Sequence, residues 1–156
     1  MHMKHFLRIP ALIFFSCLLL VACDDSDEPE PTILEGDWRS SVQTAVYYDA
    51  AGTILFESTG NDTSTVQVYR GNRMVERVGT DPGTSSTFQI FEQDGKDYVT
   101  YTPIDLQGLP GFTFELVEVT ATKMTLRSET PFALYNENGE LKEADKVVET
   151  EVFVKL

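Results

Sequence analysis

Apolar and polar residues alternate with a period of two along most of the chain after residue 33. The apolar positions of successive runs are Val66 and Val68; Phe88 and Ile90; Val99 and Tyr101; Phe112, Phe114 and Leu116; Met124 and Leu126; and Val148, Val152, Val154 and Leu156. No window of this length keeps the i, i+3, i+4, i+7 spacing of a helix, so each run predicts a strand with one buried face. In the last run this places Glu149, Glu151 and Lys155 on the opposite, polar face.

Turn-forming residues separate these runs. Pairs such as Gly71-Asn72 and Asp94-Gly95 tolerate the positive φ of tight hairpins, and such short connections make consecutive strands antiparallel neighbours. The predicted strands cover residues 37–48, 53–58, 63–70, 73–79, 84–92, 97–102, 112–120, 123–130 and 146–155, with a small further hairpin around Asn138-Gly139. The sequence therefore predicts an all-β fold, an antiparallel up-and-down meander of about 8 to 10 strands that either closes into a barrel or stacks as a sandwich. Pairing between the first and last strands distinguishes the two, because it closes the sheet.

The first 22 residues have the pattern of a signal peptide. Lys4 and Arg8 precede an apolar run from Ile9 to Ala22, and a helix of that length spans about 21 Å, less than the ~30 Å of a bilayer's hydrocarbon. The run ends in Leu20-Val21-Ala22-Cys23, which resembles the lipobox of bacterial lipoproteins. The resemblance implies cleavage before Cys23 and acylation of this residue, which then anchors the chain in a membrane. Secretion after cleavage by the ordinary signal peptidase is the alternative.

Residues 23–32 follow as a polar tether. Five acids, two prolines and no apolar residue occupy positions 24–31, and such a segment cannot bury enough surface to offset its ordering entropy. Acids directly behind the cysteine also resemble the signal that exports Bacteroidetes lipoproteins to the outer face of the outer membrane. This resemblance implies a cell-surface location. Retention at the inner membrane, which an Asp in this position indicates in enteric bacteria, and a plain solvated spacer are the alternatives.

Composition excludes several classes of function for the part after residue 22. Because Lys4 and Arg8 belong to the signal, 10 basic and 25 acidic residues remain, a formal charge of −15. Nucleic acid is not an expected partner, because neutralising phosphates requires clustered Lys and Arg. His2, His5 and Cys17 all lie in the signal, which leaves no histidine and only Cys23. Catalysis by Cys/His or Ser/His pairs, His-ligated zinc and a disulfide framework are therefore excluded.

No enzyme, cofactor or metal is expected from the acidic residues. The segment Asp94-Gly95-Lys96-Asp97 lacks the spacing of a calcium loop. A pair of carboxylates can carry out glycoside hydrolysis, but Glu115, Glu149 and Glu151 fall on the polar faces of predicted strands, where they are expected to be solvated. We therefore expect a protein without enzymatic activity.

Short motifs in residues 33–156 resemble a known family. The first predicted strand opens with Gly36-Asp37-Trp38, residues 120–126 read Thr-x-x-x-Met-x-Leu, and an apolar strand ends the chain. Together with the acidic tether, these features resemble the lipocalin-like lipoprotein domains of Bacteroidetes. The resemblance implies a closed barrel with Gly36 and Trp38 in structural roles. It also implies that Trp38 plugs one end of the barrel, with Arg127 packed over its ring as a cation–π partner.

The interior of an eight-stranded barrel is either just filled by side chains or able to hold one small ligand. By alternation, the candidate lining residues are Tyr47, Phe56, Phe88, Tyr101, Phe112 and Phe114. The long connection 103–111 carries Ile104, Leu106 and Leu109, which we expect to form a lid or binding patch, or to plug the end of the barrel.

Two functions remain open at this point. The first is an outer-membrane or surface-exposed lipoprotein whose barrel binds a small apolar ligand or presents its loops. The alternative is a β-sandwich interaction module that binds glycan or an envelope protein through its loops. The sequence identifies no particular protein partner.

Overall fold

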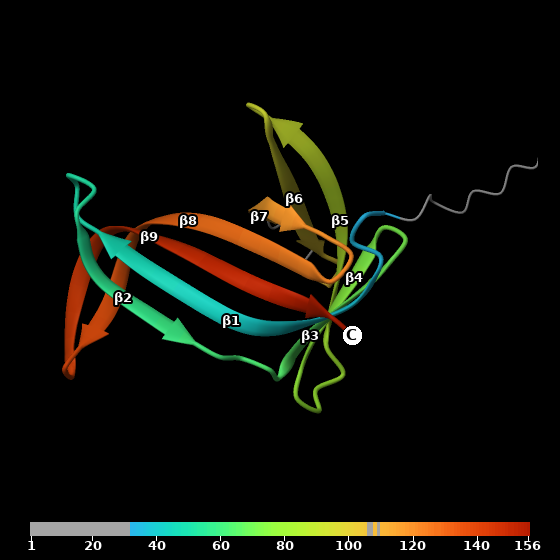
Figure 1. Cartoon of the computed structure of the whole chain (residues 1–156), viewed down its shortest axis with the longest axis horizontal. Coiled ribbons are helices and arrows are strands. Elements are labelled where there is room, and N and C mark those ends of the chain that lie inside the picture. Colours follow the sequence, from blue (N-terminus) through green and yellow to red (C-terminus); the bar gives the residue numbers. More distant parts are fainter. Residues whose placement is uncertain (1–31, 106–107, 109) are drawn as a thin grey trace, which may run out of the picture.

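The computed structural model describes residues 32–105, 108 and 110–156, which form nine strands. The strands are β1 (Gly36–Tyr48), β2 (Ile54–Gly60), β3 (Thr65–Arg70), β4 (Arg73–Val78), β5 (Thr84–Gln93), β6 (Lys96–Pro103), β7 (Phe112–Val119), β8 (Lys123–Glu137) and β9 (Glu140–Lys155), shown in Figure 1. All their pairings are antiparallel. Among the described residues, no helix is long and apolar enough to cross a membrane.

Eight of these strands close into a barrel. Their ring order is β1-β3-β4-β5-β6-β7-β8-β9, and β9 returns to pair with β1 from Trp38↔Lys155 to Tyr48↔Lys146. The extra strand, β2, pairs with the second half of β1, while β3 pairs with the first half. Because the first and last strands pair, the predicted meander barrel is confirmed and the sandwich alternative is wrong.

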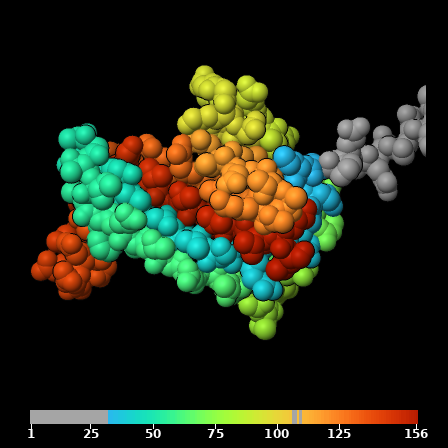
Figure 2. All heavy atoms as spheres, viewed as in Figure 1, coloured from blue at the N-terminus to red at the C-terminus, as the bar shows by residue number. Residues whose placement is uncertain are grey.

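The hairpin expected around Asn138-Gly139 is present as a continuation of β8 and β9. Pro131 pairs with Lys146 and Ala133 with Ala144, so the ladder skips the opposed residues Phe132 and Asp145, and Phe132 has a φ of 56°. A positive φ at a bulky residue such as phenylalanine marks a local turn in the strand. The tip of this hairpin consequently projects from the barrel at the lower left of Figures 1 and 2, and the β5–β6 tip projects at the top.

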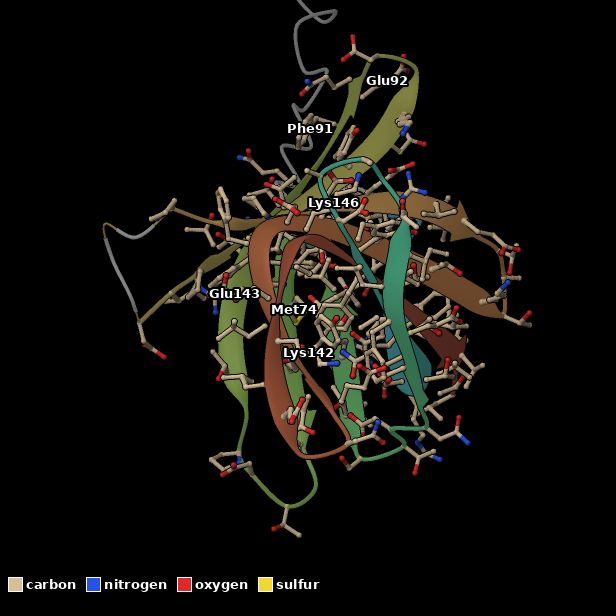
Figure 3. The ribbon with its side chains drawn as sticks, turned by 90° about the vertical axis from the view of Figure 1, so that its left-hand side faces the viewer. Met74, Phe91, Glu92, Lys142, Glu143 and Lys146 are labelled. Atoms are coloured by element: carbon tan, nitrogen blue, oxygen red, sulfur yellow. The ribbon has the colours of Figure 1, made fainter. Side chains whose placement is uncertain are left out.

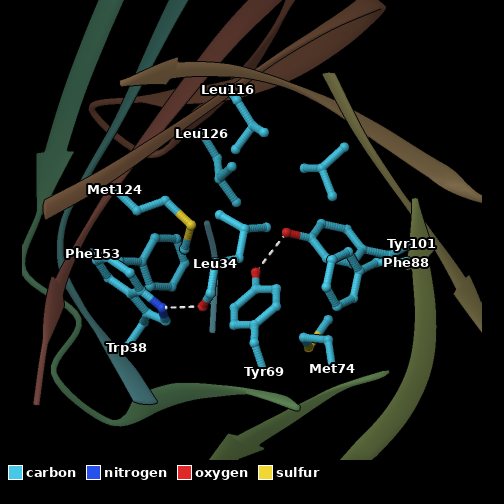
Figure 4. Close-up of a cluster of buried hydrophobic side chains, with 11 residues drawn as sticks. Leu34, Trp38, Tyr69, Met74, Phe88, Tyr101, Leu116, Met124, Leu126 and Phe153 are labelled. Atoms are coloured by element: carbon cyan, nitrogen blue, oxygen red, sulfur yellow. Dashed lines mark hydrogen bonds between the residues drawn. The ribbon is translucent and has the colours of Figure 1, made fainter. Parts of the chain in front are cut away.

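One cluster of buried side chains fills the plugged end and the middle of the barrel. It consists of Leu34, Trp38, Tyr69, Met74, Phe88, Val99, Tyr101, Leu116, Met124, Leu126 and Phe153 (Figure 4). Trp38 is fully buried, and its Nε1 donates a hydrogen bond of 2.7 Å to the carbonyl oxygen of Leu34. The segment before β1 therefore folds across the barrel end and holds the Trp38 ring there as the plug.

The Gly-x-Trp start has a steric reason. Gly36 has a φ of 131°, which L side chains rarely adopt, and a Cβ there would stand 2.6 Å from Cε of Lys155. The Lys155 ammonium lies 5.0 Å from the centroid of the Trp38 ring and donates a 2.8 Å hydrogen bond to the carbonyl oxygen of Glu35. Glycine is therefore needed to let this lysine reach the plug.

The prediction that Arg127 lies over the Trp38 ring is wrong. Lys155 occupies that place, whereas Arg127 lies on the outer wall and forms an ion pair with Glu115. Alternation explains the difference, because Leu126 points into the barrel and its neighbour must point out. The prediction placed the right kind of group over the ring but took it from the wrong strand.

On two strands, β3 and β9, the face that points into the barrel is the opposite of the predicted one. On β3 the inward residues are Gln67 and Tyr69, and on β9 they are Glu151 and Phe153, because each pairs with an inward residue of a neighbouring strand. The valines between them face outward. β-branched residues suit either face of a pleated strand, so a run of alternating valines does not by itself identify the buried side.

Both ends of the described chain lie at the plugged end. The backbone nitrogen of Leu156 donates a 2.9 Å hydrogen bond to the carbonyl oxygen of Asp37, and the residues before β1 pack on the plug. In Figure 1 these ends lie at the right and the β8–β9 tip at the left. We call the opposite end of the barrel the open rim. Because strand directions alternate around the ring, β4 and β6 end at this rim, and β5 and β7 begin there.

Candidate functional site

A pocket of about 240 Å³ lies inside the barrel between the plug and the open rim. Its apolar lining residues are Met74, Tyr101, Pro103, Phe112, Phe114 and Leu126, and its polar ones are Gln67, Glu76, Thr84, Ser86 and Glu151. At the ~30 Å³ that a water molecule occupies, this volume corresponds to roughly eight groups of that size. The interior is thus only partly filled by side chains.

Aromatic rings form one wall of the pocket. The centroids of Phe114 and Tyr101 are 5.8 Å apart, and Tyr101 is backed by Phe88 at 6.4 Å. Phe88 in turn meets Tyr69 edge to face at 5.3 Å. Phe112 stands at the open rim with 60% of its surface exposed. The wall is therefore rigid at its base, where the rings are mutually packed, and open to solvent at its upper edge.

A chain of hydrogen bonds runs from this wall to a carboxylate. The Tyr69 hydroxyl donates to Oε1 of Gln67 at 2.7 Å, so Tyr101 donates to the Tyr69 oxygen across the 2.6 Å between them (Figure 4). Nε2 of Gln67 then donates to Oε2 of Glu76 at 2.9 Å. Burial raises the pKa of both tyrosines, so their hydroxyls stay protonated. The chain satisfies polar groups that would be costly to bury alone, and it fixes the position of Glu76.

Glu151 is the second carboxylate of the pocket. Burial raises its pKa, and the negative charges of Glu76, Asp62 and Glu149 add to the rise. In the part of the chain that the structure describes, no lysine or arginine forms an ion pair with it. The expectation that Glu151 is solvated on an outward face is therefore wrong, because β9 turns this face to the interior.

Glu149 and Glu115, which were also expected to be solvated on outward faces, lie on opposite faces of the sheet. Glu149 also faces inward but remains exposed beyond the pocket's polar wall. Glu115 lies on the outer wall, as predicted, where it pairs with Arg127 and Lys96. Burial is the largest single influence and raises its pKa, but the hydrogen bonds and positive charges of Arg127 and Lys96 together outweigh it, so the pKa of Glu115 is lowered.

The predicted interior aromatics divide into three groups. Tyr101, Phe112 and Phe114 line the pocket, and Phe88 packs behind it in the core. Tyr47 and Phe56 face the same side of the sheet but form a separate cluster with Tyr135, with centroid distances of 5.9, 5.1 and 5.2 Å. Through this second cluster the β8–β9 hairpin packs against β1 and β2. Figure 3 views the molecule from this side, with Lys142, Glu143 and Lys146 along the hairpin.

The proposed lid is only partly within the described residues. Ile104 is half-buried beside Pro103 at the open rim, and its backbone nitrogen donates to the carbonyl oxygen of Ser85 at 2.9 Å. Leu106 and Leu109 lie outside the described residues, as do Cys23 and the rest of 1–31. Both the lid and the acylation therefore stay predictions. The connection does start at the rim of the pocket, since Pro103 and Phe112 flank it and line the pocket.

Sequence reasoning missed the polar wall of the pocket. Gln67 and Glu76 are not among the predicted site residues, and Glu151 was expected to be solvated, because polar residues in an alternating strand are normally assigned to solvent. The available signal was side-chain size. Tyr69 and Phe153, the largest residues of their strands, are fully buried, and they share a face with Gln67 and Glu151.

The pocket offers a ligand aromatic rings, small hydroxyl groups and two carboxylates. Among the residues that the structure describes, no three His, Cys, Asp or Glu side chains are arranged to hold a metal ion. Comparisons of the chain with protein-family models, with curated proteins and with solved structures give no match.

Proposed function

We propose that this protein is a non-enzymatic, lipocalin-like binding protein that holds a small, largely apolar ligand in its barrel. The observation that carries the proposal is the pocket of about 240 Å³ inside a sheet that is closed and plugged at one end. Ligand pockets are typically concave and mostly apolar, with a few polar groups that orient the ligand. The aromatic wall and the fixed carboxylate of Glu76 fit that description.

The size of the pocket limits the ligand. Pockets for drug-sized molecules measure ~300 to 1,000 Å³, so this one suits a molecule of roughly ten non-hydrogen atoms. A longer ligand would extend past Phe112 into solvent, because that ring is largely exposed at the rim. The plug at Trp38 prevents extension in the other direction.

The family resemblance supports the same assignment. The barrel, the Gly36 turn and the buried Trp38 are the features that the resemblance to Bacteroidetes lipocalin-like lipoproteins implies, and the structure contains all three. We extend the proposal to location: an acyl group on Cys23 anchors the protein in the bacterial outer membrane, facing the cell surface. The lipobox-like segment and the acids behind it support this part.

The location has its own test. Cys23→Ser should release the protein from the membrane fraction, and labelled palmitate should mark the wild type alone. A wild type that is soluble and unlabelled would contradict the anchor. Protease added to intact cells should remove the barrel, whereas full protection would place it on the periplasmic side.

Ligand binding is tested on protein purified from its own host. Native mass spectrometry should show a bound small molecule, and Thr84→Phe should abolish it, because Thr84 is exposed at the rim and lines the pocket. Thr113→Phe is the matched control, since Thr113 is exposed on the outer face of β7. Absence of any bound molecule in the wild type, or equal occupancy in the two variants, would refute binding at this pocket.

A further inference from the structure

The pocket has a pronounced charge asymmetry. Two of its lining residues, Glu76 and Glu151, are acidic, and none is a lysine or arginine. They come from β4 and β9, and Glu76 is close enough to raise the pKa of Glu151. None of the six ion pairs formed by the described residues includes either carboxylate. The described residues therefore place two carboxylates in one semi-enclosed space without supplying a counter-charge.

The two carboxylates differ in their hydrogen bonding. Glu76 accepts a hydrogen bond from Gln67. Glu151 is half-buried, and the fully buried hydroxyl of Ser40 lowers its pKa, against the larger rise that burial causes. That hydroxyl itself has no hydrogen-bond partner among the described residues. A half-buried carboxylate without an ion-pair partner is costly, as is a buried hydroxyl without a full hydrogen bond, so this part of the barrel can accept a further hydrogen-bond donor.

The opposite wall suits the body of an organic cation. Tyr101 and Phe114 present aromatic rings to the same space, and Phe112 extends that surface to the rim. Aromatic faces attract cations, and they also bury apolar carbon. A neutral apolar ligand would bury both carboxylates without compensation, and an anionic one would add a third negative charge.

We propose that the ligand is a small aromatic or aliphatic amine whose ammonium group lies between Glu76 and Glu151, with its apolar body against Tyr101 and Phe114. This inference rests on the proposed function and narrows its ligand class. The ammonium supplies the missing counter-charge, and its N–H groups have several acceptors in reach. The contact is a charge-assisted hydrogen bond formed away from bulk water, where such bonds are strong.

Three probes of similar shape separate the contribution of charge from that of size. At pH 7, 2-phenylethylamine is a cation, 2-phenylethanol is neutral and phenylacetate is an anion. Each would be titrated into the full-length chain carrying ¹³C-methyl methionine. The methyl group of Met74 reports on the pocket, which it lines, while Met124, fully buried beside the plug, serves as an internal reference. The amine should move the Met74 signal and leave Met124 unchanged.

Matched variants assign the effect to the two carboxylates. Glu151→Gln and Glu76→Gln keep the side-chain size and should each weaken amine binding about tenfold or more, as expected for loss of a hydrogen bond to a charged group. Glu92→Gln removes the same charge from the projecting β5–β6 tip (Figure 3), outside the pocket, and should leave the affinity unchanged. The alcohol should bind about tenfold more weakly than the amine, and phenylacetate more weakly still.

The outcomes distinguish the two proposals. If the alcohol or the acid moves Met74 with the affinity of the amine, the pocket binds ligands but the amine assignment is wrong. If Glu92→Gln weakens binding as much as Glu151→Gln, the effect is one of net charge, and the assignment is again wrong. If none of the three probes moves Met74, both the amine assignment and the pocket as a binding site are refuted.

Discussion

Phe114 and Phe153 provide a direct comparison of pocket wall and packed core. Both rings point into the barrel, but Phe153 is fully buried near the plug, whereas Phe114 is half-buried and borders the pocket. Replacing each by alanine removes the same atoms from different surroundings. The loss of stability therefore measures whether the space next to Phe114 is open.

The expected losses of stability differ by about 2 to 3 kcal/mol, as the cavity cost shows. Removal of a phenyl ring vacates about 100 Å³, and at ~24 cal/mol per Å³ an unfilled cavity of that size costs about 2.4 kcal/mol in addition to the lost transfer free energy. Phe153→Ala should thus lose about 3 to 5 kcal/mol, a large share of the ~5 to 15 kcal/mol of a typical domain. At Phe114 the vacated volume joins the pocket of about 240 Å³. The cavity cost then largely disappears, and about 1 to 2 kcal/mol remains.

Urea unfolding followed by the fluorescence of Trp38 is a suitable assay, since this is the only tryptophan in the chain and it is fully buried. With a denaturant slope of about 2 kcal/mol per M, Phe153→Ala should lower the midpoint by about 2 M and Phe114→Ala by less than about 1 M. Equal losses in the two variants would show that Phe114 is packed as tightly as Phe153. The reasoning that places open space beside it would then be refuted.

Two further predictions concern the polar interior. Tyr69→Phe should cost about 1 to 3 kcal/mol in the same assay, because it leaves the Tyr101 hydroxyl and Oε1 of Gln67 without their partner; an unchanged midpoint would contradict the hydrogen-bond chain. Glu151→Gln should be more stable than the wild type at pH 7, because a raised pKa means that the folded wild type loses stability as the pH rises above the ordinary value of 4.5. The difference should shrink as the pH falls through that value, and a gap that is independent of pH would contradict the burial of Glu151.

The fold was predictable because its signals are local. Turn pairs such as Asp94-Gly95 fix short antiparallel connections, and the alternation on β6, β7 and β8 points the correct residues inward. Gly36 and Trp38 also marked the plugged end. Each of these signals depends on a few neighbouring residues, and none requires knowledge of which strands meet across the barrel.

The polar wall was not predictable in the same way. Gln67 and Glu151 lie far apart in the sequence and come together only through the pairing of β1 with both β3 and β9. Their inward orientation contradicts the rule that the apolar residues of a strand face the core. Such a departure is a frequent mark of function, because natural sequences depart from local consistency mainly at functional or strained sites.

The position of the chain ends has a consequence for how the barrel is oriented in the cell. The segment before β1 reaches the barrel at the Trp38 plug, on the far side from the β8–β9 tip. An anchor at Cys23 would be joined to Thr32 by a stretch that spans at most about 32 Å. With such an anchor, the plug would be the part of the barrel nearest the lipid, and the open rim would face the surroundings. Ligand would then enter from the aqueous side, without first partitioning into the membrane.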